Sequence, residues 1–168
     1  MTGLFTRCCI DTSALVDLYR SSLRSDQDPE LWALFEADVV AGCVVSHREV
    51  RHELRRGSNG LAKWAVGHSS FFVDPDDLQV TALRDVLRRH GAHAVHLDRQ
   101  HKYDADPWLV AHALACDIVV VTCESPKRAH SVPRMCDLMG AKWANLQDYV
   151  AILRGSQAPW PSRMCPEE

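Results

Sequence analysis

Acidic residues recur in this chain at positions where a strand is expected to end or a helix to begin. These residues are Asp11, Glu49, Glu53, Asp106 and Glu124. Taken singly, such residues are most often helix caps or solvated surface carboxylates. Gathered in one place, they repel one another until a hard divalent cation neutralises them, which is the pattern of Mg²⁺ and Mn²⁺ sites. Because such ions activate water and stabilise the charge that develops during phosphodiester cleavage, the acids predict metal-dependent hydrolysis.

Strands and helices are expected to alternate along the whole chain, from the periodicity of the apolar residues. The expected strands are 6–10, 43–46, 118–122 and 142–146. The expected helices are 13–23, 29–42, 47–57, 59–68, 77–91, 107–116, 132–140 and 147–155. Alternation of this kind predicts an α/β fold, a three-layer α/β/α sandwich with a mostly parallel sheet of four or five strands. Ligands of such folds gather at the carboxyl ends of the strands, where Asp11 and Glu124 are expected.

Several local details follow from the same pattern. Ser46 is expected to cap the helix at 47–57, and Asp106 to cap the helix at 107–116. Four apolar residues of the helix at 77–91 are expected to face the core, namely Leu78, Leu83, Val86 and Leu87. We expect one domain over 1–154, followed by a Pro- and Ser-rich C-terminal tail at 155–168.

Three segments carrying these acids resemble the signatures of PIN domains. They are CCIDTSALVDLY, VSHREVRHELRRG and ADPWLVAHALACDIVVVTCES, and the likeness extends over residues 8–153. The ending SVPRMCDLMGAKWANLQDYVAIL further resembles an uncharacterised branch of PIN-like proteins. The order and spacing of the segments are more specific than any one of them.

The resemblance implies that Asp11, Glu53 and Asp106 are metal-site acids for Mg²⁺ or Mn²⁺. Glu124 stands where many family members have Asp, and its longer side chain leaves open whether it touches the metal directly, through water or not at all. Glu49, one helical turn before Glu53, is the alternative second acid. Three hydroxyl residues beside the acids are implied to hold the carboxylates in place, namely Thr12, Ser13 and Thr122.

The function implied by the resemblance is metal-dependent endoribonuclease activity. The toxin of a toxin–antitoxin pair is the first hypothesis, with RNA as substrate, a small antitoxin protein as partner and a homodimer as a possible assembly. A catalytically inactive PIN-like module that binds RNA or protein is one alternative. A metal-dependent nuclease that acts on DNA is another, because the same carboxylate chemistry cuts either polymer.

Basic and aromatic residues near the acids could contact a nucleic acid. Lys127 and Arg128 lie in the loop after Glu124 and are the expected phosphate-binding residues. Trp32 and Trp143 are expected in the core, whereas Trp108 is close enough to Asp106 to stack on an unpaired base.

The remaining features narrow the class of protein. The seven cysteines lack the spacing of a disulfide framework or a C-x-x-C zinc site, so they are expected to be reduced and mostly buried. Four histidines between His90 and His101 are expected in a solvated loop rather than a metal site. A net charge of −3 argues against a protein that coats nucleic acid, and no run is long and apolar enough for a membrane span. A cytoplasmic protein is expected.

Overall fold

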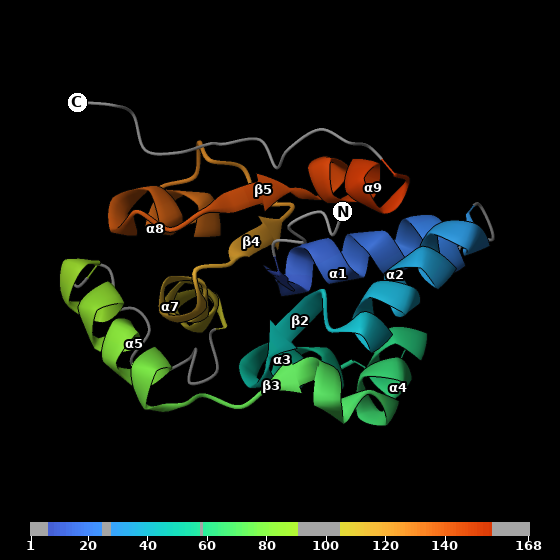
Figure 1. Ribbon diagram of the computed structural model, residues 1–168, viewed down its shortest axis with the longest axis horizontal. Coiled ribbons are helices and arrows are strands. Elements are labelled where there is room, and N and C mark those ends of the chain that lie inside the picture. The colour runs from blue at the N-terminus through green and yellow to red at the C-terminus, as the bar shows by residue number, and fades with distance from the viewer. Residues whose placement is uncertain (1–6, 25–27, 58, 91–104, 156–168) are drawn as a thin grey trace, which may run out of the picture.

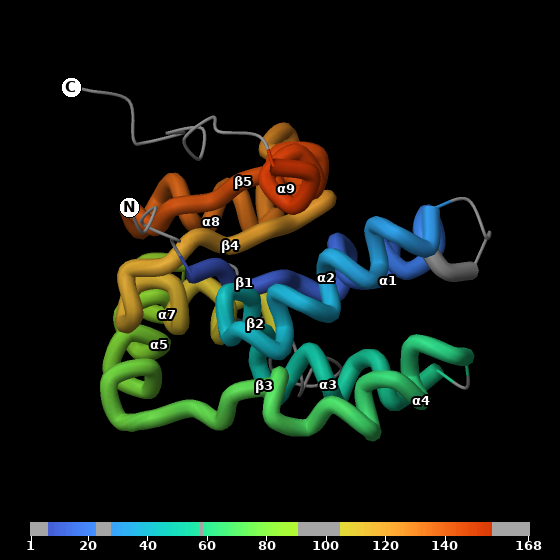
Figure 2. The backbone as a smooth tube through the Cα atoms, turned by 45° about the vertical axis from the view of Figure 1, so that its right-hand side comes forward, coloured from blue at the N-terminus to red at the C-terminus, as the bar shows by residue number. Residues whose placement is uncertain are grey.

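The computed structural model describes residues 7–24, 28–57, 59–90 and 105–155. Five parallel strands form its central sheet, in the order β3-β2-β1-β4-β5. The strands are β1 (Cys8–Ile10), β2 (Val44–His47), β3 (Phe72–Val73), β4 (Val119–Thr122) and β5 (Trp143–Asn145). Figure 2 shows them one above another, with β5 at the top and β3 at the bottom. The predicted α/β fold is confirmed, and the sheet is parallel throughout.

Helices flank the sheet and complete an α/β/α arrangement (Figure 1). The α-helices are α1 (Thr12–Tyr19), α2 (Pro29–Ala41), α3 (Arg48–Arg55), α4 (Gly60–Gly67), α5 (Asp77–Arg89), α7 (Asp106–Cys116), α8 (Val132–Met139) and α9 (Leu146–Leu153). The described residues also include two shorter helical segments, the π-helical η1 (Arg20–Arg24) and the 3₁₀ turn η2 (Ser69–Phe71). No described helix is long and apolar enough to cross a membrane.

The central position of α7 in the fold explains why this helix is apolar on almost every side. It packs against β1, β2 and β4, while α5 and α8 cover it from outside. Leu109, Val110 and Ala111 are all fully buried in this position. A helix enclosed by a sheet and two further helices has little surface left for polar residues. The same enclosure fixes the start of α7, which carries Asp106, relative to the strand ends.

One row of residues crosses the carboxyl edge of the sheet. Continued beyond the paired residues, the β1–β2 register brings Asp11 level with His47, and the β1–β4 register brings it level with Thr122. Thr122 in turn pairs with Asn145. Four polar side chains from four adjacent strands therefore stand side by side at this edge.

Each member of the row accepts a hydrogen bond from a backbone amide just after its strand. Asp11 accepts from Ala14, His47 from Glu49, Thr122 from Glu124 and Asn145 from Asp148. Such bonds satisfy amides that are left unpaired when the chain turns out of a strand or into a helix. The polar row therefore has a structural task, in addition to any chemical one.

Three local predictions were wrong. Ser46 does not cap α3, because its hydroxyl donates a 2.7 Å hydrogen bond to the Ile10 carbonyl, and His47 caps the helix instead. Asp106 lies in the first turn of α7, and Ala105 is the N-cap residue. Leu78 is 68% exposed, because the buried residues of α5, Gln79 and Val86, lie on a different face of the helix.

The remaining elements lie within a few residues of their predicted positions, and the predicted helix at 13–23 spans α1 and most of η1. The exceptions are β3 and η2, which were not predicted. Among the six cysteines described, all are free, and Cys8, Cys9 and Cys136 are buried as expected, while Cys116 and Cys123 are exposed. Trp32 and Trp143 are buried, as predicted. The histidine-rich segment at 91–104 and the tail at 156–168 lie outside the described residues.

Candidate active site

Asp11 lies at the centre of the carboxyl edge, directly after β1, and is 2% exposed. Its Oδ1 accepts hydrogen bonds of 2.7 Å from the Ala14 amide and 2.9 Å from the Ser13 hydroxyl. Its Oδ2 accepts from Ser13, at 2.9 Å, and from the Thr122 hydroxyl. Two hydroxyls and one amide therefore fix the carboxylate, as the predicted roles of Ser13 and Thr122 require.

Burial makes the charged form of Asp11 costly. Desolvation raises its pKa from 3.8 to about 6, against the opposing effect of the hydrogen bonds from Thr122, Ala14 and Ser13. The negative charge of Glu124 also contributes to this raised pKa, as the smallest of these causes. A buried carboxylate beside a second carboxylate is an arrangement that a cation would stabilise.

Glu53 connects the two other predicted acid positions. Its Oε2 accepts a hydrogen bond from the Thr12 hydroxyl, next to Asp11, and its Oε1 accepts a 3.1 Å bond from the Ala105 amide, next to Asp106. One carboxylate on α3 thus contacts both the start of α1 and the start of α7. Three acids that are far apart in sequence are brought to one edge of the fold.

Asp106 approaches the site from α7 in a partly buried position. The thiol of Cys136, buried on α8, has a pKa raised first by desolvation and then by nearby charges that include both Asp11 and Asp106. The two aspartates therefore act on the same buried group, although they lie on different elements.

Glu124 holds the start of α8. Its Oε2 accepts a 2.7 Å hydrogen bond from the Val132 amide, in the first turn of that helix. Ser131, the N-cap residue, makes no capping bond, because its hydroxyl donates to the Arg128 carbonyl. Glu124 thus replaces the usual cap, while its charge still reaches Asp11.

Residues 8–156 match the family described as "Domain of unknown function (DUF4411)". The chain belongs to the DUF4411 family. A comparison with curated proteins finds no match. The family match covers each candidate acid of the site, so the whole arrangement belongs to the DUF4411 domain.

Glu49 and Glu53 have different surroundings in this DUF4411 domain. Glu49 is 7% exposed, and its carboxylate lies 3.4 Å from the Arg48 guanidinium and 3.3 Å from the His52 imidazole. Both of these carboxylate contacts lie within α3. Glu53, in contrast, contacts the segments that carry Asp11 and Asp106, so it is the better candidate for the second metal-site acid.

The donor types of the site fit Mg²⁺ or Mn²⁺, since both ions prefer carboxylate oxygens. Over the described residues, however, no three Asp, Glu, His or Cys side chains are grouped closely enough to hold a metal ion. The oxygens of Asp11, Glu53 and Glu124 instead accept the hydrogen bonds given above. An ion would have to compete with those donors for the same oxygens.

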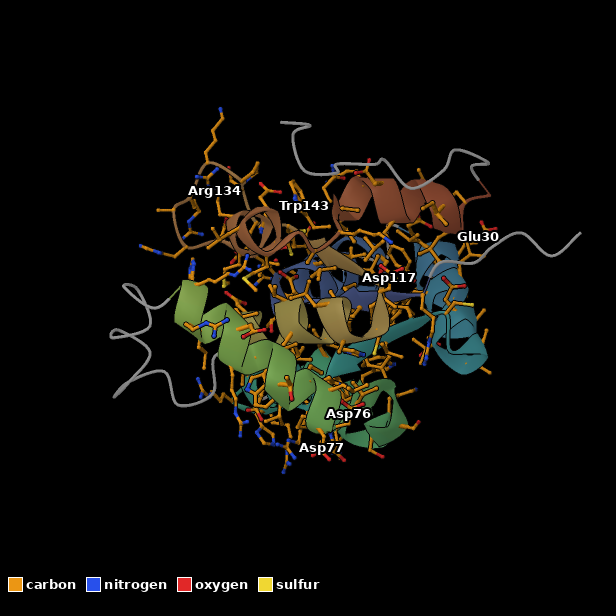
Figure 3. All side chains as sticks on the ribbon, turned by 60° about the vertical axis from the view of Figure 1, so that its left-hand side comes forward. Glu30, Asp76, Asp77, Asp117, Arg134 and Trp143 are labelled. Carbon is orange, nitrogen blue, oxygen red and sulfur yellow. The ribbon has the colours of Figure 1, made fainter. Side chains whose placement is uncertain are left out.

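Lys127 and Arg128 are exposed in the loop between β4 and α8, as their predicted role requires. Arg134 is also exposed, on α8 at the periphery of the molecule (Figure 3). Two basic residues of α3 are less available for binding phosphate. Arg51 donates hydrogen bonds to the Ala65 and Val66 carbonyls, and Arg48 pairs with Glu49 and Asp74.

Sequence reasoning missed the importance of two buried histidines. His47 belongs to the polar row, and His112 lies on α7 one turn after Trp108. Both are buried, and His47 Nε2 and His112 Nδ1 have no hydrogen-bond partner among the described residues. The four-residue spacing of Trp108 and His112, on one face of a helix, was the available signal.

Proposed function

We propose that this DUF4411 domain is a metal-dependent endoribonuclease of the PIN type. The observation that carries the proposal is the position of Glu53, whose two oxygens bond to the neighbours of Asp11 and of Asp106. Convergence of acids from three elements at the ligand-binding edge of a parallel sheet favours catalysis.

The proposed roles follow from the contacts. Asp11, Glu53 and Asp106 would supply the oxygen ligands of Mg²⁺ or Mn²⁺, and the bound ion would activate water and stabilise charge on the cleaved phosphodiester. Ser13 and Thr122 hold the Asp11 carboxylate in one orientation. Lys127 and Arg128, beyond Glu124, would bind phosphates of the RNA on either side of the cut.

The biological setting is part of the proposal and rests on the resemblance to PIN domains. In that setting the protein is a cytoplasmic toxin, held inactive by a small antitoxin protein that occupies the acidic edge, and it acts as a homodimer. Detection of a co-purifying small protein that suppresses RNA cleavage would support this part of the proposal. Full activity in the presence of every co-expressed neighbour would contradict it.

An inactive module that binds RNA or protein is the second candidate. Two observations favour it. The described acids do not form a ready metal-binding group, and both Glu53 and Glu124 are engaged by backbone amides. Under this hypothesis the carboxylates stabilise the fold, and no metal is required.

The deciding experiment is cleavage of labelled single-stranded RNA, structured RNA and DNA in Mg²⁺, Mn²⁺ or EDTA. Wild type is compared with Asp106→Asn, which keeps the size of the side chain and removes its charge. We expect RNA cleavage that requires metal and is lost in the variant. Cleavage of DNA alone would replace the proposal with a DNA nuclease, and absence of cleavage together with absence of Mn²⁺ binding by calorimetry would favour the inactive module.

A further inference from the structure

Trp108 has surroundings unlike those of the buried tryptophans. Its indole is partly exposed and stacks on the imidazole of His47, with ring centroids 5.0 Å apart and an interplanar angle of 15°. Trp32 and Trp143, in contrast, are 4% and 5% exposed. The Trp143 indole also donates a hydrogen bond to Asp137. Trp108 thus combines a fixed ring with access to solvent.

The ring beneath Trp108 is held firmly. His47 is fully buried, and its Nδ1 accepts a 3.2 Å hydrogen bond from the Glu49 amide. His112, one turn after Trp108 on α7, packs edge-on against the same imidazole, with centroids 6.4 Å apart and planes at 60°. Three rings from β2 and α7 therefore form one stack, in which Trp108 is the outermost member.

Burial keeps the two imidazoles neutral. Desolvation, then the neighbouring His112 and Arg48, lower the pKa of His47 to about 4, and burial lowers that of His112 to about 4. At neutral pH the stack under Trp108 is consequently uncharged. A flat, uncharged and immobile aromatic surface loses little conformational entropy when another ring packs on it.

The position of the stack relates it to the acids. His47 lies level with Asp11 at the carboxyl edge of the sheet, and Trp108 stacks on His47 from the first turn of α7. A ligand on Trp108 would therefore lie at the carboxyl edge, at the level of Asp11. Nucleobases are the planar groups that accompany a phosphodiester, and only unpaired bases expose a face for stacking.

We propose that Trp108 is a stacking platform for one unpaired nucleobase next to the phosphodiester that is cut. The substrate is then RNA that is single-stranded at the cleavage position. This inference rests on the proposed nuclease function and adds the substrate class to it. Trp108 is assigned as a binding residue, and His47 and His112 as residues that position its ring.

The test measures binding of a short single-stranded RNA by fluorescence anisotropy, in Mg²⁺ and in the Asp106→Asn background, so that cleavage does not interfere. Trp108→Leu is expected to weaken binding roughly tenfold to a hundredfold, the usual effect of losing one base–aromatic contact. Trp108→Phe, which keeps an aromatic face, is expected to retain most of the affinity. Thermal unfolding of each variant shows whether the fold is intact.

An abasic scan separates stacking from a general packing role. RNAs with one abasic nucleotide at each position in turn are compared on the parent and on Trp108→Leu. We expect one position at which base removal weakens binding to the parent and leaves binding to the variant unchanged. Equal losses on both proteins at every position, or equal affinity of the parent for fully paired RNA, would overturn the proposal.

Failure of this inference is distinguishable from failure of the nuclease function. Metal-dependent RNA cleavage by wild type that Trp108→Leu leaves unchanged would reject the platform and keep the nuclease. Trp108-dependent binding of single-stranded RNA without cleavage would keep the platform and favour the inactive binding module.

Discussion

The carboxylate of Glu53 accepts a 3.1 Å hydrogen bond from the amide of Ala105, 52 residues further along the chain. The contact fixes the start of α7, and with it Asp106, relative to α3. The second oxygen of Glu53 accepts a bond from the Thr12 hydroxyl, beside Asp11. Glu53 is therefore both a structural link between three segments and a candidate metal ligand, and these two roles can be separated by mutation.

Glu53→Gln keeps an oxygen for the Ala105 amide and removes the negative charge. We expect RNA cleavage to fall roughly a hundredfold, because a carboxylate at the metal site is lost. The unfolding temperature should change little, since the backbone contact has an acceptor in both proteins. Initial rates of cleavage and thermal unfolding, measured on the same samples, check both parts of the prediction.

Glu49→Gln is the matched control, because Glu49 lies one turn earlier on α3 and its carboxylate contacts Arg48 and His52 on the same helix. This variant should lose stability and keep cleavage within a few-fold of wild type. The assignment of Glu53 as the metal-site acid would be wrong if Glu49→Gln lost cleavage and Glu53→Gln kept it.

The comparison of Glu49 with Glu53 illustrates what the sequence could predict. Both residues lie on the predicted helix, four positions apart, and periodicity gives them the same helix face. What distinguishes Glu53 from Glu49 is its contact with Ala105 and Thr12, which lie outside α3. These contacts form only when the tertiary fold brings the three segments together. The fold class and most helices were predictable, because apolar periodicity is a local property of the chain.

His47 illustrates the opposite case. Its place in the polar row depends on the register between β1 and β2, which no local pattern specifies. Ser46 was the expected cap because serine is a preferred N-cap residue, yet its hydroxyl bonds across the sheet to Ile10. A buried acceptor on a neighbouring strand thus overrode a local preference, and the next residue took over the cap.

Asp11→Asn should change the pH dependence of stability in a defined direction. The Asp11 pKa is raised from 3.8 to about 6 by burial, so the folded protein holds the proton more tightly than the unfolded chain does. The contribution of the Asp11 carboxyl to the free energy of unfolding is fully present below pH 3.8 and is lost as the pH rises through about 6. The free energy of unfolding falls by about 3 kcal/mol over this range.

The variant lacks this titration, so its stability relative to wild type should increase between pH 4 and pH 7. Urea unfolding of both proteins across this range measures the difference. Glu30→Gln, at an exposed position of α2, controls for removal of a carboxylate (Figure 3). A stability difference between Asp11→Asn and wild type that stays constant with pH would contradict the predicted titration.

Glu124 is expected to act mainly through α8. Glu124→Ala removes the acceptor of the Val132 amide, and loss of such a cap costs about 1 kcal/mol of folding stability. Glu124→Gln keeps an acceptor oxygen, so most of that stability should return. The Glu124→Gln variant should cleave RNA within about tenfold of the wild-type rate, because a residue that acts on a metal site only through its neighbours has a smaller effect than a metal ligand.

Urea unfolding and cleavage rates of the two Glu124 variants check this prediction. Asp106→Asn, measured in parallel, sets the scale for loss of a metal-site acid. If Glu124→Gln lost as much cleavage as Asp106→Asn while unfolding like wild type, Glu124 would be a direct metal ligand rather than a helix cap.

Lys127 and Arg128 are expected to bind phosphate, and this role has a signature in the salt dependence of RNA binding. Each phosphate contact to a single strand contributes about 0.7 to the slope of log affinity against log salt concentration, through release of counterions. Lys127→Ala with Arg128→Ala should therefore reduce the slope by up to about 1.4. Titrations of labelled RNA at several salt concentrations, in the Asp106→Asn background, measure it.

Lys142→Ala provides the matched control for this measurement. Lys142 is also an exposed cation, but it precedes β5 at the amino edge of the sheet and lies 2.7 Å from Asp117 (labelled in Figure 3). Its removal changes the net charge without touching the carboxyl edge, so the slope should stay close to that of the parent. An equal reduction of the slope in both proteins would mean that the RNA responds to overall charge, and the loop after Glu124 would not be a specific phosphate site. A reduction confined to Lys127 and Arg128 would place the RNA backbone beside the acids.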